Sequence, residues 1–426
     1  MAGRPVPGRT AHLPPPPQVT RRGHVTLLPG PPVSRPGVVD WVDHYLAGLF
    51  NDDAAASPSF VGGQTAADEA LAGFSVRGYA GSRNEVWPPE RRGASRLSPY
   101  IRHGLLPLRR VWEAVGGGPT RDVAKYRDEL LWQEYARHVY ARLGTATRDG
   151  LRAVLRGELG PEPWPDDMAC VAMNVAELQE HGWLVNQTRM WLASQWAVRR
   201  GADWRQGEDR FFQHLLDGSR AANRAGWQWT VGTATGRPYG FSRRQVERRA
   251  PGICESCGLR DRCPIEDWPS GPPLERIDAD PRVRSDPDPD ITGGPRQPEI
   301  RHEPAAVWLT AESLGDADPA LAAHPGLPAV FAFDEPLLTG LQLSAKRLVF
   351  LAETLGDLAD RRTVEVHRGD PESVLAGRPV ATTFAPVPGW RRRAVSIDVA
   401  ELHPWPWLHR PHGTSVASYS AWRKAL

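Results

Sequence analysis

The pattern of apolar residues changes once along this chain, and this change constrains the fold more than any other feature. Between residues 39 and 268 the pattern is mainly helical, with apolar residues at helical spacing over Arg121–Tyr140 and Ala169–Arg200. Beyond residue 304, short apolar runs alternate with an amphipathic segment, which is typical of a small α/β domain with a parallel sheet. We therefore expect a mainly α chain in which a helical domain precedes a small α/β domain.

Two segments rich in proline and glycine divide the chain further. Residues 1–38 contain a four-proline run and are predicted to form a disordered tail, and residues 269–304 are predicted to be a linker. The helical domain then covers residues 39–268 and the α/β domain residues 305–426. Within the latter, the expected helix is Leu343–Asp360 and the expected strands are Ala306–Thr310, Ala329–Phe333, Thr363–His367 and Val380–Phe384.

The composition excludes several classes of protein. The formal net charge is only +2, so nucleic-acid binding would need a local basic surface. No run of about 18 apolar residues predicts a membrane span, and the N-terminal segment does not resemble a secretory signal. We expect a cytoplasmic protein without a membrane partner. The 17 tryptophans serve either as core residues or as stacking partners for planar ligands.

Four short blocks in the helical region carry polar residues in suggestive patterns. Ser95 and Ser98 precede an apolar helix, where they can cap it or lie beside a phosphate. Glu129 and Trp132 share one helical face, which suits a planar polar ligand. The third and fourth blocks run over residues 182–190 and 217–229, and the last combines a carboxylate, an amide and two indoles. Each block alone is better explained by capping or core packing.

The four cysteines suggest metal chemistry before disulfides. Cys254, Cys257 and Cys263 form a C-x2-C-x5-C-P pattern, and Cys170 is distant in sequence. Such spacing holds a tetrahedral metal or an iron–sulfur cluster, and zinc would also accept four thiolates.

The order of the four blocks, over about residues 75 to 240, resembles the FAD-binding domain of DNA photolyases and cryptochromes. The resemblance implies a photolyase-type helical domain with bound FAD, and ultraviolet-damaged DNA as the partner of a monomer. The residues that match lesion-facing or flavin N5 positions are Glu129, Trp132, Asn186, Met190 and Asn223. The residues that match cofactor-binding positions are Tyr79, Arg83, Ser95, Arg96, Leu97, Ser98, Arg189, Asp217, Ser219 and Asn223.

Within these blocks, the chain departs from the family pattern at three positions. Ala94 stands where the family has threonine, Gln133 where it has arginine, and Ser219 where it has aspartate. For the family's electron-transfer relay, Trp227 matches the inner and Trp204 the middle member. The outer member is left open among Trp183, Trp191 and Trp196.

The cysteines resemble those of one branch of the family, the iron–sulfur bacterial cryptochromes and photolyases. The resemblance implies a [4Fe–4S] cluster on Cys170, Cys254, Cys257 and Cys263. That branch is associated with (6-4) lesions, whereas Met190 is similar to the cyclobutane-dimer enzymes, so the lesion remains open.

The last part of the chain resembles the Rossmann-like antenna domain of photolyases. In ordinary members this domain comes first, so the chain is similar to a circularly permuted member. The family's arginine-rich first turn is replaced by residues 311–314, Ala-Glu-Ser-Leu, and the antenna chromophore is therefore unknown. We expect the C-terminal domain to pack back on the helical one.

Three functions remain at this point. The first is light-driven repair of pyrimidine dimers by electron transfer from reduced flavin, that is, a deoxyribodipyrimidine photolyase-like lyase. The second is a cryptochrome-like blue-light photoreceptor without repair activity, which Gln133 and Ser219 favour slightly. The third is a flavin and iron–sulfur redox protein without a DNA partner.

Overall fold

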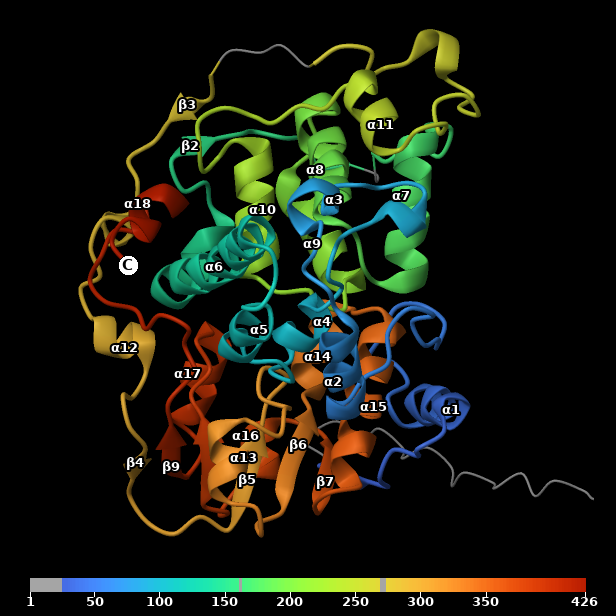
Figure 1. Ribbon diagram of the computed structural model, residues 1–426. Coiled ribbons are helices and arrows are strands. Elements are labelled where there is room, and N and C mark those ends of the chain that lie inside the picture. The colour runs from blue at the N-terminus through green and yellow to red at the C-terminus, as the bar shows by residue number, and fades with distance from the viewer. Residues whose placement is uncertain (1–24, 161–162, 269–272) are drawn as a thin grey trace, which may run out of the picture.

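The computed structural model describes residues 25–160, 163–268 and 273–426, and Figure 1 shows a helical part above a sheet with its own helices. Residues 1–24 of the predicted tail and 269–272 of the predicted linker lie outside the described residues. None of the described helices is both long enough and apolar enough to cross a bilayer. The helices of the helical part are α2 Gln64–Gly73, α3 Tyr79–Ser82, α4 Ser98–Arg102, α5 Leu108–Ala114, α6 Thr120–Leu143, α7 Ala169–His181, α8 Asn186–Ala193, α9 Trp204–His214, α10 Ala222–Val231 and α11 Arg243–Arg249.

The two predicted helical segments are present, and the second is interrupted. Helix α7 ends at Gly182, whose φ of 66° is the left-handed conformation that glycine adopts at helix ends. After a short turn, α8 begins at Asn186 and continues into a π-helical turn over Ser194–Arg199. Such turns are frequent at functional sites. The break turns α8 toward α9 and α10.

One seven-stranded sheet lies in the C-terminal part, in the order β1-β7-β6-β5-β8-β9-β4. Its five central strands are parallel, as expected, but the strands at the two edges run antiparallel to their neighbours. The sheet is therefore mixed. Its strands are β1 Thr26–Leu28, β4 Glu299–Ile300, β5 Ala306–Leu309, β6 Ala329–Phe333, β7 Val364–Arg368, β8 Val380–Thr383 and β9 Val399–His403.

The predicted disordered tail was assigned too far along the chain. Strand β1 pairs with β7, and the next element, α1 Arg35–Tyr45, packs on a helix of the sheet domain. Trp41 of α1 lies 6.1 Å from Phe333 of β6 between ring centroids, so burial of its indole orders this segment. The other helices around the sheet are α13 Pro319–Ala323, α14 Glu335–Leu341, α15 Ala345–Ala359, α16 Pro371–Val374 and α17 Pro388–Ala394.

The predicted linker is not a free tether over its described residues. It contains β3 Glu275–Arg276, which pairs with β2 Ala153–Val154, and the short helix α12 Pro289–Gly293, and it ends in β4 of the main sheet. Asp286 forms an ion pair with Arg142 of α6 at 3.1 Å, and both side chains are almost fully buried. Such a pair fixes the segment against the helical part.

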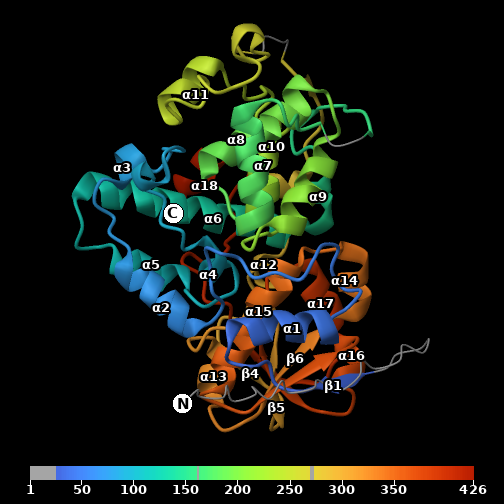
Figure 2. The ribbon, with the colours of Figure 1, turned by 90° about the vertical axis from the view of Figure 1, so that its right-hand side faces the viewer.

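The C-terminal domain packs back on the helical one, as expected. Arg347 of α15 is buried and donates from Nη2 to the carbonyl oxygen of Gly218 at 3.1 Å, and from Nη1 to that of Phe212. The Ser344 N–H donates to the carbonyl oxygen of Gln213 at 3.0 Å. Helix α18 Tyr419–Arg423 then returns to α6, and Figures 1 and 2 show the two side by side.

Candidate functional site

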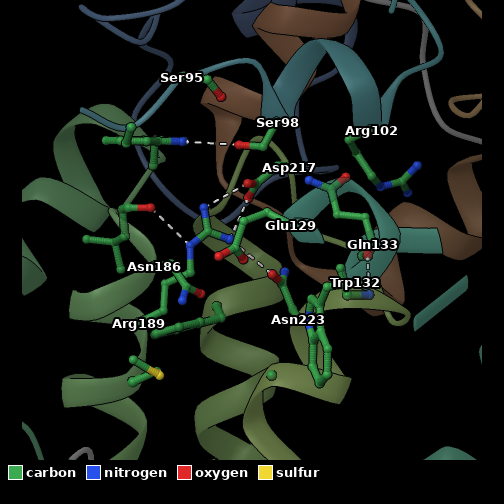
Figure 3. Close-up of a pocket in the computed structure, with 18 of the residues that line it drawn as sticks. Ser95, Ser98, Arg102, Glu129, Trp132, Gln133, Asn186, Arg189, Asp217 and Asn223 are labelled. Carbon is green, nitrogen blue, oxygen red and sulfur yellow. Dashed lines mark hydrogen bonds and ion pairs between the residues drawn. The ribbon is translucent and has the colours of Figure 1, made fainter. Parts of the chain in front are cut away.

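A single cavity in the helical part gathers most of the predicted site residues. Helices α3, α6, α8 and α10 and the segment before α4 contribute to it, and Figure 3 shows their side chains turned toward the same space. The predicted residues that line this cavity are Tyr79, Arg83, Ser95, Arg96, Ser98, Glu129, Trp132, Asn186, Arg189, Met190, Asp217, Ser219, Asn223 and Trp227.

An ion pair between α8 and the segment before α10 organises the cavity (Figure 3). Arg189 donates from Nη1 and Nη2 to the two carboxylate oxygens of Asp217, at 3.1 and 2.7 Å. Arg189 also donates from Nη1 to the Asn223 Oδ1 at 3.2 Å. A bidentate pair of this kind fixes both groups in direction and distance. It therefore holds the amide of Asn223 in one orientation.

Two buried donors at this cavity lack acceptors among the described residues. They are the Asn223 Nδ2 and the Trp227 Nε1. Because Arg189 occupies the amide oxygen, the Asn223 NH2 group is the part left for a ligand. Buried donors are almost always hydrogen-bonded in proteins, so an acceptor from a bound molecule fits this position.

Arg96 is the second unusual feature of the cavity. Its φ of 59° is left-handed, which is uncommon for a residue other than glycine. The guanidinium lies over the rings of Phe60 and Trp183, at 5.0 and 5.6 Å from their centroids. No carboxylate forms an ion pair with it in the described ranges, and burial lowers its pKa. A cation held without a carboxylate suits an anionic ligand group.

One residue of the serine block, Leu97, lies elsewhere than expected. Leu97 was predicted to bind the cofactor, but its side chain is fully buried in the core. Its N–H donates to the Ser95 Oγ at 3.4 Å, while the Ser98 Oγ accepts from the Trp183 Nε1 at 3.2 Å. The buried Leu97 side chain therefore supports the two serines from the core side of the segment.

The predicted lesion-facing residues stand on the wall formed by α6 and α8. Glu129 accepts from Arg83 Nε at 3.3 Å and pairs with Lys125 at 2.9 Å. Burial and this nearby carboxylate raise the pKa of Tyr79, which stays a phenol at neutral pH.

Trp132 also lines a second, adjoining cavity with Trp229 and Tyr419. Trp229 has 39% of its surface exposed, so one wall of this cavity is open to solvent. The sequence did not identify Tyr419 as a site residue, because only tertiary packing brings α18 to α6. Arg102 and Arg137 of the first cavity were also missed, and Trp183, considered only as an outer relay member, lines that cavity as well.

A row of indoles leads away from the first cavity. Trp227 contacts Trp196 of the π-helical turn at 6.5 Å between ring centroids, and Trp196 contacts Trp164 at 4.8 Å. Gly207 of α9 makes this close approach possible, because a Cβ there would lie 2.2 Å from the Trp227 ring and 2.9 Å from Trp196. Trp204, the predicted middle member of a relay, is buried in the same apolar cluster.

The four cysteines meet at one small cavity, away from the first. Cys170 lies in the first turn of α7, and Cys254, Cys257 and Cys263 lie in the loop after α11. Burial raises the pKa of Cys254 to about 11 and also raises that of Cys170, so both are neutral thiols at pH 7 in this structure. No three of these sulfurs lie within 4.8 Å of one another in the described part of the chain.

Comparison with known proteins finds a family match within the helical part of the chain. Residues 169–246 match the family described as FAD binding domain of DNA photolyase. The deoxyribodipyrimidine photo-lyase of Vibrio cholerae is 32% identical over 169 residues, which are 35% of this chain and 36% of that protein. The enzyme of the same name from a Synechococcus strain is 28% identical over 190 residues, which are 40% of this chain and 38% of that one.

The chain thus spans less than half the length of the curated relatives it matches. Among solved structures, a bacterial class III photolyase from Agrobacterium tumefaciens is 28% identical, covers 39% of this chain and 37% of its own, and has a TM-score of 0.34.

Proposed function

We propose that this chain, which carries the FAD-binding domain of the DNA photolyase/cryptochrome superfamily, is a monomeric, cytoplasmic flavoenzyme that uses blue light to split pyrimidine dimers in ultraviolet-damaged DNA. The observation that carries the proposal is the convergence of the four sequence blocks on one cavity, beside a second cavity lined by Trp132 and Trp229. Reduced FAD, when bound, would supply the light-excited electron that breaks the dimer and would then recover it.

The first cavity fits FAD by the chemistry of its donors. The Asn223 NH2 group, held by Arg189, can donate to a planar ring system without supplying a proton as an acid would. The guanidinium of Arg96, which donates to the Ser59 carbonyl oxygen but pairs with no carboxylate among the described residues, suits the phosphates together with Ser95 and Ser98. The roles of the remaining predicted residues in this cavity belong to the same proposal.

The second cavity suits a base that has left the DNA stack. Enzymes that act on a base extrude it and stack it between aromatic side chains. Trp132 and Trp229 offer two such faces, and Glu129, Asn186 and Met190 lie on the flavin side of Trp132. Because the two cavities share Trp132, a base bound there would lie next to the flavin.

The indole row supports a route by which the flavin could be kept reduced. The contacts from Trp227 through Trp196 reach Trp164, which is partly exposed to solvent. We propose that these three residues form the relay. Trp204, whose position in the sequence matches the family's middle member, is the alternative second step.

The topology of the sheet supports a Rossmann-like, permuted domain. Counted from β5 along the chain, the five parallel strands lie in the order 3-2-1-4-5, which is that of the mononucleotide-binding fold. The helical domain precedes these strands, which is the reverse of the order that the resemblance implies for ordinary members.

The four cysteines suit an iron–sulfur cluster, with a zinc ion as the alternative. A single zinc ion with bonds of about 2.3 Å would bring the sulfurs to within about 4 Å of one another. The order of the cysteines resembles the iron–sulfur branch of the family, and their meeting at one cavity supports a cluster held by Cys170, Cys254, Cys257 and Cys263. Anaerobic preparations should contain iron and acid-labile sulfide, whereas zinc without sulfide would refute the cluster.

The experiment for the flavin and lesion sites uses Trp132→Ala. Loss of a stacking platform, worth about 1–3 kcal/mol per base, should weaken binding of dimer-containing DNA about tenfold or more. Heat-released FAD, measured by chromatography, should remain at the wild-type level. A colourless folded protein that cannot be reconstituted with FAD would end the proposal.

A blue-light photoreceptor without repair activity is the second candidate. Gln133, which replaces the family's arginine, lines the flavin cavity and provides the observation in its favour. Such a protein would bind FAD and become photoreduced but would leave both cyclobutane and (6-4) lesions intact.

A further inference from the structure

Three side chains of the α/β domain converge outside the cavities described above. His324 directly follows α13, and Glu401 and His403 lie two residues apart on β9, so they point to the same face of the sheet. The His324 Nε2 lies 2.7 Å and the His403 Nε2 3.2 Å from the Glu401 Oε2. All three atoms lie within 4.8 Å of one another.

We propose that His324, Glu401 and His403 form a binding site for a divalent first-row transition-metal ion. Two imidazole nitrogens and one carboxylate oxygen are the ligands of three-residue zinc sites and of non-haem iron sites. Bonds of about 2.0–2.2 Å to one ion separate its ligand atoms by about 3.0–3.5 Å. The spacing of 2.7 and 3.2 Å is already close to this range.

Metal binding requires a defined rearrangement of protons and no redox step. Each Nε2 directs its lone pair to the ion, so each imidazole is neutral and carries its proton on Nδ1. The ion replaces the two imidazole–carboxylate hydrogen bonds, and the carboxylate remains ionised.

The environment of the three residues leaves one side accessible. The side chain of His403 is 5% exposed and that of Glu401 is 11% exposed, while His324 at 20% borders the solvent. The backbone carbonyl of His324 accepts from Arg362 at 2.6 Å, which fixes the turn after α13. An ion held here would tie α13 to β9 and keep a coordination position open to water. The site therefore suits an ion that stabilises the domain.

The experiment measures zinc binding to the full chain by calorimetry, with metal analysis after dialysis. In wild type we expect one zinc bound by the three residues. Glu401→Gln and His324→Gln should each weaken that binding about a hundredfold or more, since even second-sphere changes cost 10–100-fold. Added zinc should raise the melting temperature of wild type and leave that of both variants unchanged.

Two controls separate this site from other zinc ligands. His302→Ala removes a half-exposed histidine that pairs with Asp398 at 3.1 Å, and it should bind zinc as wild type does. A Cys254→Ser, Cys257→Ser double variant should still bind one zinc, and Glu401→Gln in that background should abolish it. Because His324 is the most exposed of the three, its variant keeps the test open if Glu401→Gln fails to fold. Equal zinc stoichiometry and affinity in wild type and His324→Gln would overturn the proposal.

Discussion

The phenol ring of Tyr419 lies edge-on against the indole of Trp132, with ring centroids 5.3 Å apart and an interplanar angle of 66°. The Tyr419 hydroxyl donates to the Asp128 Oδ1 at 2.5 Å, one turn of α6 before Trp132. Tyr419 of α18 thus holds in place Trp132 of α6, the tryptophan that lines both cavities. A segment near the end of the chain in sequence supports the proposed lesion pocket.

Replacement of Tyr419 should affect DNA binding without removing the flavin. An edge-to-face aromatic contact is worth about 0.5–1.5 kcal/mol, so Tyr419→Ala should weaken binding of damaged DNA about 2- to 10-fold. Tyr419→Phe retains the ring and should have a smaller effect. Fluorescence anisotropy with dimer-containing DNA measures both. Equal affinities in wild type and Tyr419→Ala would show that Trp132 needs no support from α18.

The Arg189–Asp217 pair should be required for the flavin site. Asp217→Asn leaves Arg189 without its carboxylate in a poorly exposed position, which should cost about 3–5 kcal/mol and lower the FAD content. As a matched control, Asp316→Asn removes a pair with Arg361 that is largely exposed, and should cost less than about 1 kcal/mol. Absorbance of bound flavin and the melting temperature check this. A variant with full FAD content would contradict the assigned role.

The rate of flavin photoreduction should distinguish Trp196 from Trp204 as the second residue of the relay. Trp227→Phe should bind FAD but slow its photoreduction, and Trp196→Phe should do the same if electrons follow the ring contacts. Trp204→Phe is then the control and should remain close to wild type. Slow photoreduction in Trp204→Phe together with a normal rate in Trp196→Phe would assign the route to Trp204 instead.

His138 makes the attachment of the C-terminal segment sensitive to acid. Its Nδ1 accepts from the Trp422 Nε1 at 2.9 Å, and burial lowers its pKa to about 3. Since the unfolded imidazole has a pKa near 6.5, the unfolded state binds more protons between these values. The stabilisation is therefore complete above pH 6.5 and is lost as the pH falls toward 3.

The matched variant is His138→Gln, whose amide does not titrate but can accept from the Trp422 indole and donate to the His409 carbonyl oxygen, which lies 2.8 Å from the His138 Nε2. Between pH 7 and 4.5, wild type should lose more stability than this variant, by on the order of 1–3 kcal/mol. Denaturant unfolding at a series of pH values measures the difference. Parallel curves for the two proteins would contradict the role of His138.

The sequence predicted the local parts of the site better than the parts that depend on tertiary contacts. Asp217, Asn223 and Trp227 lie within one short segment, so α10 and the turn before it bring them to one cavity. Tyr419 and Arg347 reach the helical part only because the α/β domain folds back, and no local pattern signals that contact.

The elements of the sheet show the same limit. The central strands β5 to β8 were predicted: β5 and β6 are continuous apolar runs, and β7 and β8 contain the β-branched residues valine and threonine. Strand β9 was missed although it mixes apolar and polar residues much as β7 does, and its Glu401 and His403 hydrogen-bond to one another in the fold. The edge strands β1 and β4 have only three and two residues, which is too short for a periodic signal.

The most direct test of the proposed function is repair itself. Purified protein with its flavin reduced would be mixed with DNA that contains defined cyclobutane or (6-4) lesions, and irradiated with blue light. We expect light-dependent restoration of intact pyrimidines for at least one lesion, no repair in the dark, and strong loss of repair in Trp132→Ala. Reduced, FAD-loaded wild-type protein that neither binds nor repairs either lesion under light would contradict the account and favour the photoreceptor.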